Sequence, residues 1–584
     1  MRCLPWLVIV TGLALSATAQ ADTRHVSSEP AWQAKQAPPL LAPRIADYPN
    51  SNVARLRFAE LAAARIEQLK AHNRADASKR YQIGIERAVA AELASASAPA
   101  LRWQPTADRG QVARFAATSP AAAALRIGLD VHELPAGAEL RFFGERDRES
   151  VVAPVAAAEI AALRREHPIY WTPVTEGATQ TVELYVPAGA DLRQVRLTWT
   201  AVSHLVVSPF GELDLEKIGE SQPCQIDVRC VSNPSTAFLN AKAAVARMLF
   251  QTGGGTATCT GTLLNDTDTS TQIPHFFSAA HCFTSQSVAN TLTTLWFQEA
   301  SACGSGVEDS GTRQVAGGAQ IEFADAASDV LLVRLNNNPP SGAVFGGWDA
   351  NPVTVGSEIA VIHHPSGDVK KVSLGQVTGQ GGSSLASGQF LKVGYTSGST
   401  EGGSSGSALL TFTGSEFVTR GGLLGGAASC GNSGSLSNPN NSDDFSRLDL
   451  AFSNLRQYLA PASTPQPPSN IDYSGAWAAP GQSGWGLIVL RGASGVYAMY
   501  IYHYNQSMLP TWYLMSGNLS GTTFQASILQ FRGPWFGTVP FSESQVSAQT
   551  VGNITVNFAS ASTATINFTI DGRSVSTSIN RLSF

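Results

Sequence analysis

The placement of the cysteines is the feature that most constrains the fold of this 584-residue chain. Six of its seven cysteines lie within about 210 residues of one another: Cys224, Cys230, Cys259, Cys282, Cys303 and Cys430. An even number of cysteines confined to one region of an exported chain is typical of a disulfide framework, although the sequence alone leaves their pairing open. A zinc site is the competing interpretation, but only the adjacent His281 and Cys282 favour it, and no CxxC pair exists. We therefore expect disulfides and no metal.

The first 21 residues indicate export. They carry Arg2, an apolar stretch over residues 4–15 and the small-residue ending Ala19-Gln20-Ala21 ahead of Asp22. This pattern predicts a secretory signal peptide cut after Ala21, and a protein secreted by way of the periplasm. No later segment has the roughly 18 consecutive apolar residues of a membrane span, so we expect no transmembrane segment. The net charge of −5 and the lack of a basic tract argue against a nucleic-acid partner.

Three polar residues of the cysteine-rich region have the local settings that nucleophilic catalysis requires. His281 closes an apolar stretch and is followed by a half-cystine, Asp329 opens the apolar run 330–333, and Ser405 lies in the Gly/Ser-rich turn 402–408. A general base must be held in place, its orienting carboxylate must be buried, and the nucleophile needs little bulk around it. A lone Gly/Ser turn is usually a flexible loop. The three pieces in this order predict a Ser-His-Asp triad.

This triad predicts acyl transfer from a peptide to water. Ser405 attacks the carbonyl, His281 takes its proton and later gives it to the leaving amine, and Asp329 orients the imidazole ring. The backbone N–H groups of Gly403 and Ser405 are expected to face the oxyanion. The pair 363–364 offers a rival histidine base, but two strand histidines before a proline are usually structural, and both follow the Asp rather than precede it.

Seven short stretches of the cysteine-rich region resemble the secreted bacterial lysyl endopeptidases, a branch of the chymotrypsin-fold serine proteases. They are spread over residues 218–461: 224–230, 259–263, 280–282, 328–329, 362–365, 401–407 and 442–447. The resemblance implies a double β-barrel core, the three catalytic roles given above and no cofactor. It also implies three disulfides, which join Cys224 to Cys430, Cys230 to Cys303 and Cys259 to Cys282.

The resemblance also suggests which side chain the enzyme cuts after. Trypsin-like enzymes carry a pocket Asp six residues before the nucleophile, where this chain has Ser399. The lysyl endopeptidases draw that anion from a later loop, and the matching residue is Asp443, with Asp444 or a merely solvated acid as the alternatives. An anion at the base of an apolar slot selects a basic side chain. Leu424 replaces a histidine of the known members, which leaves Lys versus Arg preference open and weakens a Glu-specific interpretation.

The block between Asp22 and Lys217 contains no cysteine and is rich in Ala and Arg. Residues 45–98 have helical spacing with many charges, whereas four later segments alternate apolar and polar residues as strands do: 125–131, 139–143, 181–186 and 195–199. We predict an α+β propeptide with a helical leader and a β-sandwich, which assists folding and blocks the catalytic cleft. An independent N-terminal binding domain is the alternative.

Lysines are scarce around and after the end of this N-terminal block. Lys217 lies seven residues before Cys224, close to where related mature enzymes begin, so we expect the enzyme to process its own precursor after Lys217. Beyond it the chain has only four lysines: Lys242, Lys370, Lys371 and Lys392. An enzyme that cuts after lysine gains from this scarcity, and an Arg-over-Lys bias from genome composition is the alternative explanation.

A Pro-rich linker over residues 462–470 precedes a small C-terminal domain, 471–584, without Lys or Cys. Alternation over 495–502 and 553–558 predicts an all-β fold. The stretches 482–487 and 509–515 resemble an aromatic β-domain appended to exported proteins of some gammaproteobacteria. Its Trp and Tyr residues usually fill the core of such a domain, but exposed rings would suit contact with a cell surface or polysaccharide.

Taken together, the sequence predicts a mainly β protein with a chymotrypsin-like double-barrel core that acts as a secreted serine endopeptidase. Its partners would be polypeptide substrates, cut after basic residues with Lys favoured, and its own propeptide. The alternatives are cleavage after Arg or Glu, and a catalytically inactive protease-like protein that binds a surface.

Overall fold

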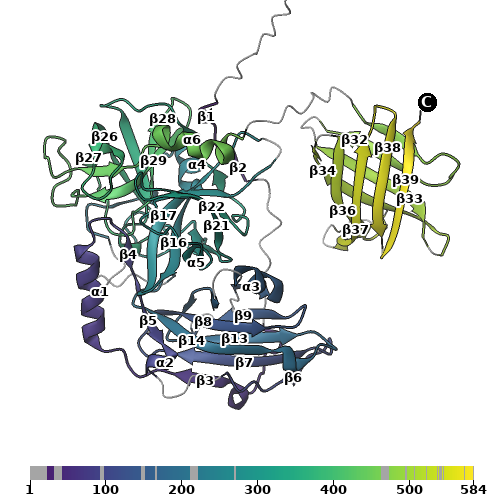
Figure 1. Ribbon diagram of the computed structural model, residues 1–584, viewed down its shortest axis with the longest axis horizontal. Coiled ribbons are helices and arrows are strands. Elements are labelled where there is room, and N and C mark those ends of the chain that lie inside the picture. The colour runs from purple at the N-terminus through teal and green to yellow at the C-terminus, as the bar shows by residue number, and fades with distance from the viewer. Residues whose placement is uncertain are drawn as a thin grey trace, which may run out of the picture. The chain divides into compact units, whose positions relative to one another are not determined.

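The computed structural model describes residues 23–31, 43–92, 98–145, 152–164, 168–210, 221–268, 271–461 and 472–582, apart from 493–495, 506, 521, 536, 538–541, 543–544 and 571. The predicted signal peptide, the processing residues Ala21 and Lys217 and the linker 462–470 lie outside these ranges. Strands dominate, which confirms the mainly β prediction. The chain divides into two compact units, residues 1–461 and 462–584 (Figure 1). Within the described ranges, no helix is long and apolar enough to cross a membrane.

The N-terminal block contains two sheets that share one hydrophobic core. The first has the order β10-β9-β13-β7-β3, with β6 on β7: β3 (Ala54–Arg57), β6 (Gln104–Pro105), β7 (Gln111–Thr118), β9 (Glu139–Phe143), β10 (Val152–Ala156) and β13 (Thr179–Val186). The second has the order β11-β8-β14-β5, with β12 on β8: β5 (Gly84–Ala88), β8 (Ala124–Glu133), β11 (Ile169–Trp171), β12 (Thr175–Glu176) and β14 (Arg196–Leu205). Phe115 of one sheet meets Trp199 of the other edge-on at 5.4 Å. This arrangement is a β-sandwich.

The predicted helical leader is helical only in part. Helix α1 (Ala63–Ala75) and the short α2 (Val89–Glu92) lie in it, but β3 and β5 lie there too. β3 pairs in parallel with β7, and β5 pairs with β14, so each strand completes a sheet of the sandwich. Partner strands far along the chain therefore decide the local conformation, which helical spacing alone does not reveal.

The first sheet of the cysteine-rich region has the order β20-β19-β16-β17-β18-β22-β21. Its strands are β16 (Val245–Thr252), β17 (Gly255–Leu264), β18 (His275–Ser278), β19 (Thr293–Trp296), β20 (Arg313–Val315), β21 (Ala319–Asp325) and β22 (Val330–Leu335). Trp296, Phe276 and Met248 are fully buried in its core. An eighth strand, β4 (Tyr81–Gln82), comes from the N-terminal block and pairs with β17.

The second sheet closes on itself. Six antiparallel strands follow one another as β29-β28-β25-β26-β27-β30, and β30 pairs back onto β29, which makes a barrel: β25 (Glu358–His363), β26 (Lys371–Gly382), β27 (Gln389–Ser397), β28 (Ala408–Phe412), β29 (Phe417–Gly426) and β30 (Asp443–Phe445). Helix α6 (Leu448–Leu459) packs beside it, with Phe452 on the ring of Trp348 at 5.2 Å.

The C-terminal unit has a nine-stranded sheet, of which eight strands close into an up-and-down barrel and the ninth, β35 (Leu519–Ser520), pairs with β36. The order β34-β33-β32-β31-β39-β38-β37-β36 is completed by a β34–β36 pairing: β31 (Gly475–Ala478), β32 (Gly486–Arg491), β33 (Tyr497–Tyr504), β34 (Pro510–Gly517), β36 (Thr523–Arg532), β37 (Ser547–Phe558), β38 (Thr563–Ile570) and β39 (Arg573–Arg581) (Figure 1). Closure leaves no free strand edge between these eight strands. Trp477, Tyr473 and Tyr513 fill its interior, whereas other rings, such as Trp512 and Trp535, are exposed.

Candidate active site

The sheet register brings His281 and Asp329 together. His281 follows β18 and Asp329 immediately precedes β22, and these two strands are antiparallel neighbours. The ring Nδ1 of His281 lies 2.9 Å from Oδ2 of Asp329, and the backbone N–H of His281 donates to Oδ1 at 2.8 Å. Asp329 is buried and has a left-handed backbone, with φ of 55°. The carboxylate of Asp329 thus fixes the orientation of the imidazole ring through a hydrogen bond with Nδ1. The other ring nitrogen, Nε2, has no hydrogen-bond partner among the described residues.

The turn that carries Ser405 is fixed against β17. Thr260 donates its backbone N–H to the carbonyl of Ser405 at 2.8 Å and its hydroxyl to the carbonyl of Gly403 at 2.9 Å. Gly403 has φ of 91°, and a Cβ there would lie 2.7 Å from the carbonyl oxygen of His364, so the position requires glycine. The turn leaves the N–H of Gly403 free to donate to an incoming carbonyl.

That carbonyl is supplied by the chain itself. Gly403 N–H donates to the carbonyl oxygen of Lys79 at 2.6 Å, and the side chain of Lys79 is buried. Lys79 Nζ lies 2.7 Å from Oδ1 and 2.8 Å from Oδ2 of Asp443. It also donates to the hydroxyl of Thr400 at 2.6 Å and to the carbonyl of Ala428 at 3.0 Å. Lys79 therefore places its side chain on Asp443 and its carbonyl oxygen on the N–H of Gly403.

Asp443 is the buried first residue of β30 rather than a solvated loop acid. Besides Lys79, its carboxylate accepts hydrogen bonds from Tyr395 at 3.0 Å, from the backbone of Ala428 at 3.3 Å and from the hydroxyl of Thr400. Burial and the Asp443 charge raise the pKa of Tyr395 well above its ordinary value, so this phenol remains a neutral donor.

Asp444, the acid next to Asp443 in β30, points away from Lys79. Successive side chains of a strand face opposite sides, and Asp444 pairs with Lys392 at 2.6 Å, away from Lys79. Ser399, the residue six positions before the nucleophile, is buried, and its hydroxyl has no partner among the described residues. Leu424 is buried in β29. Only Asp443 of the predicted candidates reaches the lysine in the pocket.

The hydroxyl of Ser405 does not point at His281. It donates instead to the carbonyl of Ser78 at 2.7 Å. On the other side of Lys79, Arg80 Nη1 donates to the carbonyl of His281 at 3.3 Å, and Tyr81 and Gln82 form β4 on β17. Residues 78–82 therefore contact both Ser405 and His281. Sequence reasoning missed this segment, because no local pattern links it to a pocket more than 300 residues away.

The two histidines considered as a rival base are structural. His363 is fully buried between hydroxyls, with Nδ1 2.8 Å from Ser404 Oγ and Nε2 3.0 Å from Ser373 Oγ. Burial, aided by the positive charge of nearby lysines, lowers its pKa to about 3. Burial also lowers the pKa of His364 well below its ordinary value, and its Nδ1 lies 3.0 Å from the carbonyl of Asp368.

The six cysteines form three disulfides: Cys224–Cys430, Cys230–Cys303 and Cys259–Cys282. The third joins β17 to the turn that carries His281. Cys259, Cys282 and His281 are also close enough together to suggest a metal cluster. The sulfurs of Cys259 and Cys282 are bonded to each other in the disulfide, so neither can serve as a thiolate ligand.

The four lysines that follow Lys217 are all engaged. Lys242 pairs with Glu299 at 2.6 Å, Lys392 pairs with Asp444, and Lys371 pairs with Asp227. Lys370 is fully buried and donates to the carbonyl of Lys242 at 2.6 Å.

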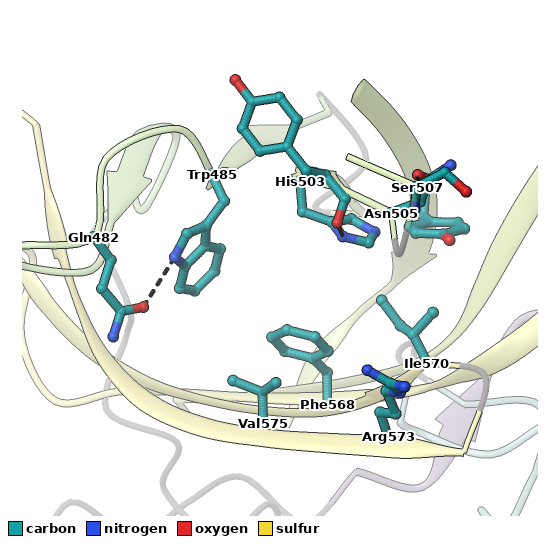
Figure 2. Close-up of a pocket in the computed structure, with 11 residues that line it drawn as sticks. Gln482, Trp485, His503, Asn505, Ser507, Phe568, Ile570, Arg573 and Val575 are labelled. Atoms are coloured by element: carbon teal, nitrogen blue, oxygen red, sulfur yellow. Dashed lines mark hydrogen bonds between the residues drawn. The ribbon is translucent and has the colours of Figure 1, made fainter. Parts of the chain in front are cut away.

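A separate cavity of about 620 Å³ lies in the C-terminal barrel (Figure 2). Three connections at one end of the barrel, β31–β32, β33–β34 and β38–β39, contribute to its lining. Trp485 meets Phe568 at 6.2 Å, and the ring of His503 stacks on Tyr513 at 5.1 Å. Trp485 and His503 lie across the cavity from Phe568, and Arg573 adds a cation to its rim (Figure 2).

Comparisons with known proteins identify the family of this chain. Residues 57–206 match the lysyl endopeptidase N-terminal domain, and residues 218–446 match the lysyl endopeptidase C-terminal domain. A lysyl endopeptidase of Pseudomonas aeruginosa strain PAO1 is 38% identical over 372 residues, which cover 62% of this chain and 78% of that protein.

Solved structures show a weaker likeness. The HtrA-type protease AlgW with a tripeptide is 14% identical, with 60% of this chain and 99% of that chain covered and a TM-score of 0.28. A thermostable serine protease from an extremophilic microorganism is 13% identical, with 38% and 99% covered and a TM-score of 0.27. The family assignment rests on the sequence matches: the chain belongs to the lysyl endopeptidase family and is a serine endopeptidase.

Proposed function

We propose that this protein is secreted as an inactive precursor and, once activated, hydrolyses peptide bonds after lysine. The observation that carries the proposal is the ion pair between Lys79 and Asp443. An ammonium group that lies 2.7 and 2.8 Å from the two oxygens of a buried carboxylate marks a pocket built for a basic side chain. A substrate lysine would replace Lys79 there.

The pocket favours lysine over arginine. An ammonium group has three N–H donors, and in this pocket they meet Asp443, Thr400 and the carbonyl of Ala428. A guanidinium is planar and carries five N–H donors, so it cannot reproduce this compact arrangement and would leave donors unpaired. A glutamate in the same place would set two carboxylates against each other in a buried site.

Hydrolysis would proceed through an acyl-enzyme. Once the hydroxyl of Ser405 turns from Ser78 toward Nε2 of His281, which has no partner among the residues described, it can pass its proton to the ring and attack the lysyl carbonyl. The backbone N–H groups of Gly403 and Ser405 would stabilise the oxyanion. His281 would then protonate the leaving amine and activate water for the second step, while Asp329 holds the ring in the required tautomer.

The N-terminal block is proposed to be a propeptide rather than an independent binding domain. It delivers residues 78–82 to the catalytic residues and adds a strand to the catalytic sheet. Its sandwich also packs on that sheet, since Ser203 and Thr256 share a hydrogen bond of 2.7 Å. The N-terminal signal pattern supports export.

The test of specificity is mass spectrometry of peptides that the activated enzyme releases from a denatured protein. Nearly all new C-termini should be lysine. Predominant cleavage after Arg or Glu would select the alternative specificity. An inactive surface-binding protein would release no peptides and would leave Ser405 unlabelled by a phosphonate probe.

The C-terminal barrel is proposed to bind a sugar chain at its open end. Cavities at the mouths of eight-stranded barrels commonly hold a small ligand, and aromatic faces beside polar groups suit sugar rings. Oligosaccharides should therefore change the tryptophan fluorescence of the full protein. Trp485→Ala should abolish that change, whereas replacing Trp512, which is exposed outside the cavity, should not. Equal loss in both variants would contradict this site.

A further inference from the structure

The segment that fills the catalytic site is itself arranged as an inhibitor. We propose that Lys79 is the residue by which the N-terminal block shuts the protease, and that it does so without offering the Lys79–Arg80 bond for cleavage. This inference rests on the proposed function, because it takes Asp443 to be the anion that receives lysine.

Occlusion follows from two sets of contacts. The side chain of Lys79 is 7% exposed and uses the carboxylate of Asp443, and the backbone carbonyl of Lys79 uses the N–H of Gly403. A substrate needs both the pocket anion and the oxyanion donor at the same moment. Neither is available while Lys79 is bound.

The bound segment is not positioned for reaction. Attack requires the hydroxyl of Ser405 to give its proton to His281, but this hydroxyl donates to Ser78 instead, and Nε2 of His281 has no partner among the residues described. Lys79 also has φ of 61°, in the left-handed region that lysine rarely adopts, whereas protease substrates are bound in an extended conformation. The peptide bond is therefore next to the triad in an unproductive conformation.

Hydrogen bonds within the block hold this conformation. Asn73, at the end of α1, donates to the carbonyl of Gln82 at 2.8 Å and accepts from its backbone N–H at 2.9 Å. These two bonds tie together the chain on either side of Lys79. Asp76 accepts from the backbone N–H of Ser78 at 2.9 Å. If Ser405 were acylated by Lys79, the Arg80 amine so released would stay in place and would re-form the peptide bond by attack on the ester.

The contacts by which Lys79 inhibits the protease are non-covalent, so cleavage of the chain elsewhere does not remove them. A cut after Lys217 would separate the block from the protease in sequence, but every contact of Lys79 would persist. The pocket would open only when the block dissociates or is destroyed.

The first experiment measures access to the pocket in the full chain. All variants carry Ser405→Ala, so nothing is cut, and the probe is a fluorescein-labelled tripeptide ending in lysine amide, followed by fluorescence anisotropy. Lys79→Ala should bind the probe at least ~10-fold more tightly than the chain with native Lys79. Lys70→Ala is the matched control, since Lys70 lies on α1 and pairs only with the exposed Glu67 among the described contacts; it should leave the pocket closed.

Lys79→Met provides a second variant, which keeps an unbranched side chain of nearly the same length and removes the ammonium group with its charge and its N–H donors. If both Lys79 variants are folded by circular dichroism and exclude the probe as well as the native precursor does, Lys79 is not the inhibitory residue. That result is distinct from failure of the proposed function, in which the activated native enzyme would not hydrolyse lysyl bonds.

The second experiment tests the unproductive conformation. In chains with native Ser405, rapid denaturation in acid followed by mass spectrometry should find no fragment ending at Lys79. Asn73→Ala removes both bonds to Gln82 and should produce that fragment, and adding Lys79→Ala should remove it again. Stoichiometric cleavage after Lys79 in the native, folded precursor would overturn this part of the proposal.

Discussion

Asp443 and Asp444 are adjacent in β30 yet bind different lysines, Lys79 in the pocket and Lys392 on the opposite side of the strand. Because the two side chains face opposite sides of the strand, substituting each one separately tests which of them receives the substrate side chain. Asp443→Asn should lower kcat/KM for lysyl substrates by about 10³-fold, because a buried ammonium would lose its counter-charge. Asp444→Asn should keep the preference for lysine. The measurement is hydrolysis of matched lysyl and arginyl peptides, together with labelling of Ser405 by a small acylating probe, which both variants should retain. Loss of discrimination in Asp444→Asn alone would reassign the pocket anion.

The triad should fail as a unit. Ser405→Ala, His281→Ala and Asp329→Asn should each lower turnover by at least ~10⁴-fold, since each step of proton transfer needs all three groups. Ser407→Ala is the matched control in the same turn, because its hydroxyl is buried without a partner among the described residues. Turnover of a lysyl ester by the activated variants gives the comparison, and substantial activity in Ser405→Ala would remove the nucleophile assignment.

Buried His363 should make the folded state sensitive to acid. Its folded pKa of about 3 is below the ordinary value of 6.5, so between these values the unfolded chain binds a proton that the folded chain excludes. The free energy of unfolding should therefore be unaffected above pH 6.5 and fall as the pH drops, by about 2 kcal/mol at pH 5 from this residue.

Urea unfolding of the Ser405→Ala precursor at pH 7 and pH 5 measures this loss. His363→Gln should reduce the difference between the two pH values, whereas His132→Gln, at an exposed position, should not. An unchanged pH dependence in His363→Gln would mean that other groups cause the acid sensitivity.

The disulfide between Cys259 and Cys282 closes a loop of 23 residues around the segment that leads to His281. Replacing both cysteines with alanine should lower the free energy of unfolding by about 3 kcal/mol, mainly because the unfolded chain gains freedom. Urea unfolding in the Ser405→Ala background gives the value. The activated double variant should also lose activity, since the turn that carries the base is no longer tethered; full activity would show that hydrogen bonding to Asp329 suffices.

Processing after Lys217 should depend on the Ser405 nucleophile of molecules whose site Lys79 has left. Purified Ser405→Ala protein should remain a precursor that retains residues 22–217, and a trace of active enzyme should convert it to a form beginning at Ile218. N-terminal sequencing provides the readout. Normal processing of Ser405→Ala with no other protease present, or a mature terminus far from Ile218, would rule out this route.

The proposed triad could be read from the sequence because each residue has a local signature: an apolar strand before His281, an apolar strand after Asp329 and a glycine-rich turn around Ser405. The structure pairs His281 with Asp329, and the catalytic roles stay a prediction. The mainly β architecture followed likewise from alternating segments. The partner of Asp443 was not predictable. Lys79 reaches it across 364 positions through the docking of a separate sandwich, and nothing near Lys79 in the sequence encodes that docking. The strands β3 and β5 were missed for the same reason, because their partners are distant.

The ion pairs and hydrogen bonds of the lysines in the protease region affect how well the enzyme resists cleavage by other copies of itself. An endopeptidase that cuts after lysine is a hazard to itself at high concentration, but Lys242, Lys370, Lys371 and Lys392 are each tied into the folded structure, and no lysine follows them. A folded molecule therefore offers its neighbours little to attack. An unfolded copy exposes all four lysines at once. If the enzyme cuts after lysine, as proposed, a population of the mature protein would destroy its damaged members and spare the intact ones.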